Sequence, residues 1–90
     1  MEATFSEIDQ SVQSLPAKSS FRVDEVCALV EIRPYVLRFW EKEFKGIDSL
    51  SSSSGQKVYE RDVVKLLMFA KYLLFVKKMP LAMAKKELEN

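Results

Sequence analysis

Apolar positions in the middle of the chain recur at the spacing of two short helices. Residues 24–30 place three aliphatic side chains on one face: Val26, Leu29 and Val30. Acidic residues open this segment, where the positive end of the helix dipole stabilises them. Residues 34–44 begin with Pro34, and proline is favoured at the first position of a helix. Because so few residues separate the two segments, the pattern predicts two helices joined by a tight turn, which is the outline of a helix-turn-helix.

The second of these segments distributes its aromatic residues over two faces. At about 100° per residue, one face carries a predicted core stripe: Leu37, Trp40 and Phe44. The opposite face mixes aromatic and cationic side chains: Tyr35, Arg38, Phe39 and Lys42. Such a face suits nucleic acid, because cations and tyrosine hydroxyls bind phosphates and a phenyl ring contacts sugar or a thymine methyl. The alternative is that the two outer rings stack on each other or contact a neighbouring loop.

A longer helix, predicted over roughly 61–78, is apolar on two sides. Its expected core stripe is Val63, Leu66, Leu67, Ala70, Leu73 and Leu74. A second stripe follows the other side: Val64, Met68, Tyr72 and Phe75. A helix that is apolar all round is normally buried on all sides, and a chain of 90 residues has little material to cover both faces. We therefore expect the N-terminal segment or another chain to cover the second stripe.

Between the helices, the sequence carries signals of a loop and of short strands. Four consecutive serines, Ser51–Ser54, precede Gly55, which indicates a flexible connection or a hairpin tip. Residues 56–59 are predicted to form a short strand that returns from this tip. Residues 21–23 are expected to be an extended lead-in to the first helix.

The two ends of the chain are expected to differ. Met79-Pro80 ends the long helix, and a last helix is predicted over about 81–89. The first twenty residues are polar, with apolar residues at helical spacing: Phe5, Ile8, Val12 and Leu15. Residues 1–20 are therefore interpreted as an N-terminal tail or a short amphipathic segment that docks on this chain or on a partner. Residues 21–90 are predicted to form the domain.

Composition indicates one compact domain of low net charge. The apolar fraction of 48% is ample for one compact domain, and the net charge is only +1. The positive excess lies in residues 56–90, which hold eight basic and four acidic residues. With one cysteine, Cys27, and no histidine, neither an intrachain disulfide nor a Cys/His zinc site is expected. We expect Cys27 to be a small buried residue.

Catalysis and membrane insertion are not expected. Without histidine, and with only two glycines, no set of nucleophile, base and orienting group or phosphate loop can be assembled. We therefore predict no enzyme, no cofactor and no metal. The most apolar stretch, 63–76, contains two lysines and is shorter than the roughly 20 residues that a spanning helix needs. The start of the chain lacks the pattern of a secretory signal, so a cytoplasmic protein is expected.

The order of these segments resembles the DNA-binding domain of MerR-family transcription regulators. The resemblance is carried by FRVDEVCALVEIRPYVLRFWEKEF, then SGQKVYERDVVKLLMFAKYLL and LAMAKKEL. It is similar in particular to the subgroup with a tryptophan in the recognition helix, here LRFWE at 37–41. The resemblance implies a mainly α fold, a winged helix-turn-helix of about four helices with a small β wing.

The resemblance also implies how such a domain meets DNA. Residues 34–44 would enter the major groove as the recognition helix, and Ser51–Tyr59 would form a wing on the DNA backbone. Carried over by position, the helix contacts would be Arg33, Tyr35, Arg38, Phe39 and Lys42. The wing contacts would be Ser54, Gln56, Lys57 and Tyr59, whereas Leu37, Trp40 and Glu41 would be structural. Family members bind double-stranded DNA as dimers at inverted-repeat operators, which implies a cytoplasmic, nucleoid-associated protein.

Two departures from the family pattern keep a second hypothesis open. The stretch KGIDSLSSSSGQK, residues 45–57, leads into the expected wing and is mostly serine with an acid, Asp48, where relatives usually carry lysine and arginine. Each lost phosphate contact weakens the salt-dependent part of DNA binding. The sequence also stops at Asn90, where a dimerisation helix would ordinarily follow. The alternative is a protein–protein interaction module on the same fold, which binds another copy or another protein through the stripe Val64, Met68, Tyr72 and Phe75, or through residues beyond 90.

Overall fold

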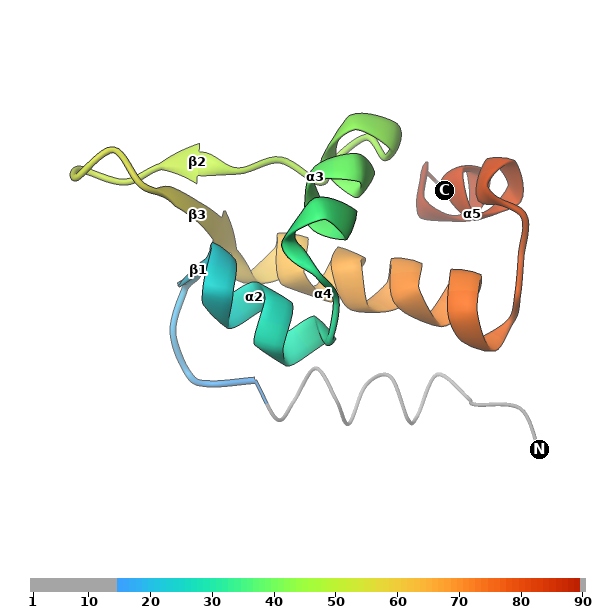
Figure 1. Cartoon of the computed structure of the whole chain (residues 1–90), viewed down its shortest axis with the longest axis horizontal. Helices are drawn as coiled ribbons and strands as arrows, with labels where there is room; N and C mark the ends of the chain where they lie inside the picture. The colour runs from blue at the N-terminus through green and yellow to red at the C-terminus, as the bar shows by residue number, and fades with distance from the viewer. Residues whose placement is uncertain (1–14, 90) are drawn as a thin grey trace.

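The computed structural model describes residues 15–89 of the chain (Figure 1). The elements follow in the order β1 (Ser20–Arg22), α2 (Val23–Val30), α3 (Pro34–Glu43), β2 (Leu50–Ser51), β3 (Lys57–Glu60), α4 (Arg61–Lys71), the π-helical turn η1 (Tyr72–Val76) and α5 (Leu81–Glu89). The fold is mainly helical with a small amount of β-structure, as the resemblance implied, and the strands form one three-stranded sheet. It is a winged helix-turn-helix.

The turn between α2 and α3 is held by backbone and side-chain bonds. Glu31 adopts the left-handed conformation that often ends a helix, with φ of 61°. The N–H of Ile32 donates to the carbonyl of Cys27 at 3.1 Å. From α4, the ammonium of Lys71 donates to the carbonyl oxygens of Val30 at 2.9 Å and of Glu31 at 3.0 Å. These bonds satisfy carbonyls that the end of α2 would otherwise leave unpaired.

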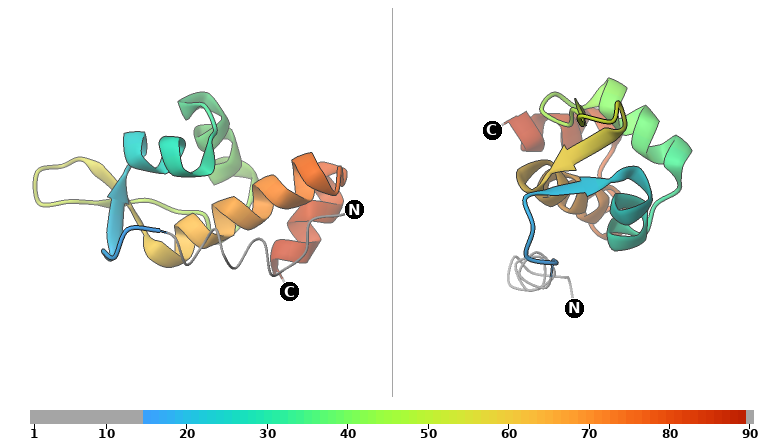
Figure 2. Two further views of the ribbon diagram at one scale, coloured as in Figure 1. Left: turned by 90° about the horizontal axis from the view of Figure 1, so that it is seen from below. Right: turned by 90° about the vertical axis from the view of Figure 1, so that its left-hand side faces the viewer.

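The three strands form one antiparallel sheet in the order β1-β3-β2. Phe21 lies opposite Tyr59, and Ser51 lies opposite Lys57 next to the hairpin tip. The tip is closed by backbone bonds, from the N–H of Ser52 to the carbonyl of Gln56 at 2.7 Å and from the N–H of Gly55 to the carbonyl of Ser52 at 2.9 Å. Of the two readings of the serine run, the structure therefore supports the hairpin tip. Figures 1 and 2 show this hairpin projecting from the helical body as the wing.

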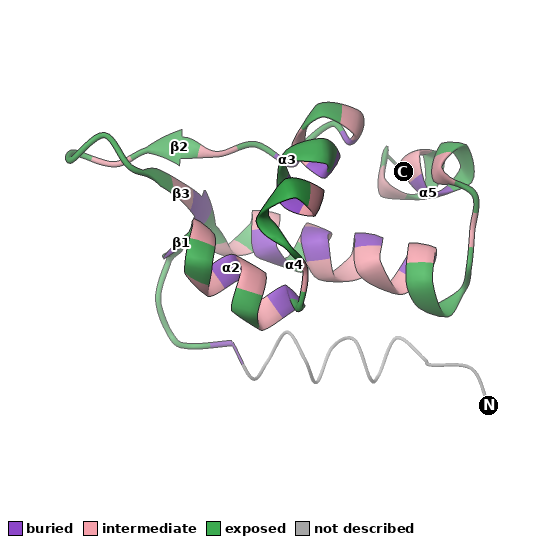
Figure 3. Cartoon of the chain, viewed as in Figure 1, coloured by how far each residue is buried: buried purple, intermediate pink, exposed green. Residues whose placement is uncertain are grey.

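The core lies where α2, α3, α4 and the sheet meet (Figure 3). The predicted core stripe of α3 is confirmed, because Leu37, Trp40 and Phe44 are all buried. In α2, Val26 and Val30 are buried as expected, but Leu29 is only partly buried.

The division of α4 into two stripes is wrong in part. Its fully buried residues are Val64, Leu67 and Ala70, followed by Leu73 in η1. Val63 and Leu66, expected in the core, are only partly buried, as is Leu74. Both sides of the helix are apolar, so periodicity alone did not determine its rotation, which packing against α2 and β3 determines. Val64 is thus a core residue, not part of an exposed partner surface.

The long helix ends earlier than predicted, and its last turn is wound differently. Its α-helical hydrogen bonds give way to π-type bonds in η1, and the helix ends at Val76, not at residue 78. Lys78 then takes a left-handed conformation with φ of 55°, and the N–H of Met79 donates back to the carbonyl of Leu73 at 2.9 Å. The last helix, α5, matches its predicted range.

The chain before β1 packs on the start of α4. Leu15 is buried, and the guanidinium of Arg61 donates to the carbonyl of Pro16 at 2.7 Å. The backbone N–H of Arg61 also donates to the carbonyl of Ser19 at 3.0 Å. The remaining apolar positions of the N-terminal pattern, Phe5, Ile8 and Val12, lie outside the described residues. Within residues 15–89, no helix is long and apolar enough to cross a membrane.

The corrected rotation of α4 can be tested with two neighbouring valines. Val64→Ala removes two buried methyl groups and should lower the free energy of unfolding by about 2 kcal/mol. Val63→Ala, in the same helix but only partly buried, should lower it by less than about 1 kcal/mol. Urea denaturation followed by circular dichroism measures both. Equal losses, or a larger loss at Val63, would contradict the assignment of Val64 to the core.

Candidate nucleic-acid interface

The rotation of α3 is determined by its buried side. Leu37 and Trp40 face the core, and the Trp40 ring contacts Phe44 edge-on with centroids 6.2 Å apart. A second aromatic contact joins Trp40 to Phe75 of η1, with centroids 6.4 Å apart. Because these contacts prevent the helix from turning about its axis, the side chains on its other side face outward.

The outward face carries the aromatic and cationic residues that the sequence singled out. Tyr35 and Phe39 are 66% and 49% exposed, which is unusual for large aromatic side chains. Arg38 and Lys42 are also exposed, as is Arg33 in the turn before the helix. Among the described residues no ring contact joins Tyr35 to Phe39, so the structure does not support the alternative that they stack on each other.

The cationic side chains of this face have no anionic partner within the described part of the chain. Neither a hydrogen bond nor a salt bridge joins the side chains of Arg33, Arg38 or Lys42 to another residue of 15–89. An unpaired cation is available to an external anion without first losing an internal partner. The face therefore combines positive charge with flat apolar surface, which is the chemistry of a nucleic-acid contact.

The wing contributes mainly neutral polar groups. Ser54 and Gln56 are exposed at the tip, where the hydroxyls of Ser52 and Ser54 lie 2.9 Å apart. The hydroxyl of Ser52 also accepts a hydrogen bond from the N–H of Gln56 at 3.2 Å. Lys57, at the start of β3, is the cation nearest to the tip along the chain. Hydroxyl, amide and ammonium groups all donate to phosphate oxygens.

Tyr59 does not belong to the exposed wing surface. Successive residues of a strand point to opposite faces, and Tyr59 falls on the inner face of β3, where it is only 1% exposed. Its hydroxyl donates to the Oε2 atom of Glu41 at 3.1 Å. Burial, together with the neighbouring Glu41 carboxylate, raises the pKa of Tyr59, so the phenol remains a protonated donor at neutral pH. The prediction that Tyr59 contacts DNA is therefore wrong in the state described.

Glu41 connects α3 to the wing. Its side chain is 14% exposed, and the oxygen that accepts from Tyr59 also lies 3.9 Å from the ammonium of Lys57. Lys57 itself is 55% exposed along its side chain. This carboxylate thus holds the middle of α3 against β3, a role beyond the general structural one that the resemblance implied.

Sequence reasoning did not single out Arg22, at the junction of β1 and α2. Arg22 lines a shallow hollow with Gln56 and Lys57, two of the residues predicted as wing contacts. Its Nε lies 3.7 Å from carboxylate oxygens of both Asp24 and Glu25. The backbone N–H of Arg22 donates to Glu25 at 3.0 Å, which lowers the pKa of that carboxyl. The sequence did contain a signal for the position of Arg22 at the start of α2, namely the acidic pair Asp24 and Glu25. A carboxylate three residues after the N-cap residue can accept a hydrogen bond from the backbone N–H of that N-cap residue.

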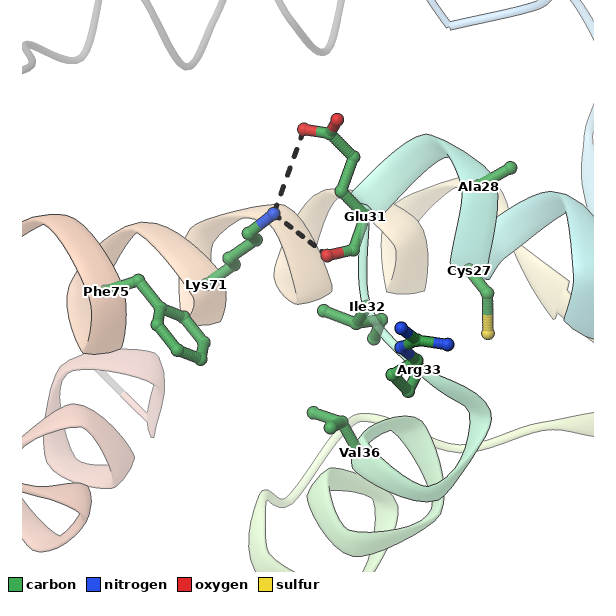
Figure 4. Close-up of a pocket in the computed structure, with 8 residues that line it drawn as sticks. All are labelled: Cys27, Ala28, Glu31, Ile32, Arg33, Val36, Lys71 and Phe75. Atoms are coloured by element: carbon green, nitrogen blue, oxygen red, sulfur yellow. Dashed lines mark hydrogen bonds and ion pairs between the residues drawn. The ribbon is translucent and has the colours of Figure 1, made fainter.

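An apolar pocket of about 420 Å³ lies beside the turn (Figure 4). Ile32, Val36 and Phe75 line it, and the ion pair of Lys71 with Glu31 lies at its rim at 3.8 Å. Cys27 also lines this pocket and is only partly buried, contrary to expectation. Burial is the main cause that raises the pKa of its thiol, which is therefore protonated at neutral pH. No group of metal-binding side chains occurs among the described residues.

Comparison with known proteins identified one family. The model described as MerR HTH family regulatory protein matches residues 21–90, which is more than three quarters of the chain. The match begins at the predicted domain start and includes both helices of the helix-turn-helix, the wing, α4 and α5. No curated protein and no solved structure matches the chain.

The bond between Tyr59 and Glu41 predicts a measurable contribution to stability. Tyr59→Phe keeps the buried ring but removes the donor to a carboxylate, so the free energy of unfolding should fall by about 1.5 kcal/mol. The matched control is Tyr35→Phe, which removes a hydroxyl from the exposed ring of α3 and should change stability little. Denaturant titrations at neutral pH compare the two. A Tyr59→Phe protein as stable as the wild type would show that the bond contributes nothing.

Proposed function

The chain belongs to the MerR family of helix-turn-helix regulatory proteins, and from this premise we propose that residues 21–90 are the DNA-binding module of a transcription regulator. In this proposal α3 is the recognition helix and enters the major groove, while the β2–β3 hairpin is the wing that follows the backbone. The tryptophan-containing subgroup is part of the proposal, with Trp40 as the residue that anchors α3 to the core.

One observation supports this proposal most strongly, the outward face of α3. Two cations of this face, Arg38 and Lys42, have no anionic side-chain partner within residues 15–89, and two exposed aromatic rings lie beside them, while the other side of the helix is buried. Arg33, in the turn before the helix, has no such partner among those residues either. An arginine can donate two hydrogen bonds to a guanine edge, and an aromatic ring can contact a thymine methyl. We assign Arg38 and Phe39 to this kind of base contact. Arg33, Tyr35 and Lys42 are proposed to contact phosphates on either side.

The wing is proposed to bind the backbone through neutral donors more than through charge. Ser54 and Gln56 supply a hydroxyl and an amide at the tip, and Lys57 adds one cation. Because few phosphates would be neutralised, the affinity of a single module should depend less steeply on salt than that of a wing rich in lysine. We therefore propose that the protein acts as a homodimer on an inverted-repeat operator, which doubles the contacts made by one module.

The proposal predicts that Arg38 is needed for DNA binding. Arg38→Ala should weaken binding to a labelled duplex selected from a random-sequence pool by about tenfold or more, because a specific arginine contact contributes about 1–3 kcal/mol. Lys86→Ala, which removes an exposed cation from α5, is the matched control and should bind like the wild type. Fluorescence polarisation across a salt series measures affinity and its salt dependence together.

The same titration can reject the proposal. If no duplex is selected from the pool, or if wild-type binding does not weaken as salt rises, the module does not bind DNA through cationic contacts. Equal losses for the Arg38 and Lys86 variants would indicate a general effect of charge and not a specific face.

A second candidate function is supported by the apolar surface around η1. Phe75 is 59% exposed at the pocket between η1 and the turn, and Val76 beside it is also exposed. Met68 and Tyr72, which the sequence placed on the same stripe, are half-buried. Exposed apolar surface of this kind is typical of protein–protein contacts. We propose, as the alternative, an interaction module in which η1 contacts a second copy or another protein.

This alternative predicts that Phe75 is needed for association. Phe75→Asp should shift the protein towards the monomer in sedimentation velocity, because the buried carboxylate would oppose contact. Met83→Asp introduces the same charge at an exposed apolar residue of α5 and is the matched control. Thermal unfolding of both variants is measured alongside, because the Phe75 ring also contacts Trp40. A wild-type protein that is monomeric at all concentrations, and captures no partner, would remove this alternative.

A further inference from the structure

The cations of the wing and of the hollow beside it differ from those in and before α3 in how they are paired. Lys57 lies 3.9 Å from a carboxylate oxygen of Glu41, and Arg22 lies 3.7 Å from two carboxylates of α2. Arg33, Arg38 and Lys42 have no such partner within the described residues. The wing side of the candidate interface is therefore neutralised internally, whereas the helix side is not.

We propose that Glu41 is a positioning residue that holds the ammonium of Lys57 against α3. Its carboxylate occupies the ammonium that a DNA phosphate would otherwise bind, and so limits how tightly the wing binds DNA. The inference rests on the proposed DNA-binding function and adds a regulator of affinity within the site. In the free domain the carboxylate is the anion that Lys57 contacts. On DNA the lysine would exchange it for a phosphate oxygen.

The geometry favours this role because only one member of the pair can move. The carboxylate of Glu41 is largely buried, and its Oε2 atom accepts the hydrogen bond of the buried Tyr59. Lys57 has a long side chain that is 55% exposed. The anion therefore has a determined position between α3 and β3, and the cation can leave it without any change in the core.

The exchange carries an electrostatic cost that is specific to this pair. When Lys57 moves to a phosphate, Glu41 remains behind as a negative charge without its cation, close to the proposed DNA path. The pair is long, at 3.9 Å, and its lysine is exposed, so it is weak and the exchange is possible, but the exchange reduces what the lysine contributes to binding. Removing the charge of Glu41 should therefore strengthen DNA binding, which is the opposite of what a DNA-contacting residue would show.

The test is Glu41→Gln, which keeps a carbonyl oxygen for the Tyr59 hydroxyl and removes the charge. We expect the variant to bind the selected duplex about two- to fivefold more tightly, the range that corresponds to the loss of a weak ion pair. The slope of log affinity against log salt should become steeper by up to about 1, the value for one additional phosphate contact.

Glu43→Gln provides the matched control on the same helix. Glu43 also pairs with a lysine, Lys85 of α5, at 3.6 Å, but that pair does not involve the wing. The Glu43→Gln variant should keep the wild-type affinity for the duplex and the wild-type dependence of that affinity on salt. In a Lys57→Gln background, Glu41→Gln should lose most of its effect, since no wing lysine remains to be released.

The outcomes separate this inference from the proposed function. If the wild type binds no duplex, the proposed function fails. Two results would overturn the inference while the proposed function stands. In the first, the wild type binds DNA but Glu41→Gln binds no more tightly; in the second, Glu41→Gln strengthens DNA binding equally in the Lys57→Gln background. If Glu41→Gln unfolds, Lys57→Gln is compared with Lys42→Gln in the wild type, because both lysines are proposed to contact phosphates and Lys42 has no anionic side-chain partner within residues 15–89. Loss of the restrained Lys57 should then cost less affinity than loss of Lys42, and an equal or larger loss would overturn the inference.

Discussion

The burial of Leu37 and Trp40 is the constraint on which the rest of the candidate interface depends. These two side chains fix the rotation of α3 against the core, and the ring contacts of Trp40 with Phe44 and Phe75 extend this anchoring to the end of the long helix. Every exposed residue of α3 derives its direction from that packing. The binding chemistry of one face is thus a consequence of hydrophobic burial on the other.

Sequence reasoning succeeded where the two sides of an element differ in chemistry. The core face of α3 was predictable because charged residues mark the opposite face, and Pro34 and the acidic pair of α2 mark helix starts. It failed in α4, where both sides are apolar and packing against neighbouring elements, among them α2 and β3, determines which side is buried. The exposed positions of α3 could be predicted, but their role in DNA binding remains a prediction.

The misplacement of Tyr59 has a different physical origin. A motif carried over by position says which residues lie near a wing, but not which face of the strand they occupy. The two-residue period of β3 places Tyr59 inward and its neighbours outward. Likewise, a count of charges along the sequence cannot tell a paired cation from an unpaired one. Lys57 and Arg38 contribute equally to the net charge, yet the structure gives them different surroundings.

The hairpin tip has a consequence for how this protein can diverge. Its turn is closed by backbone bonds, by the hydroxyl of Ser52 and by Gly55, whose φ of 84° suits a residue without a side chain. Ser53 is exposed and takes no part in those bonds. A change there to lysine or arginine can add a positive charge without removing any of those bonds. Affinity for a polyanion can therefore change in small steps during evolution, while the fold that carries the wing stays the same.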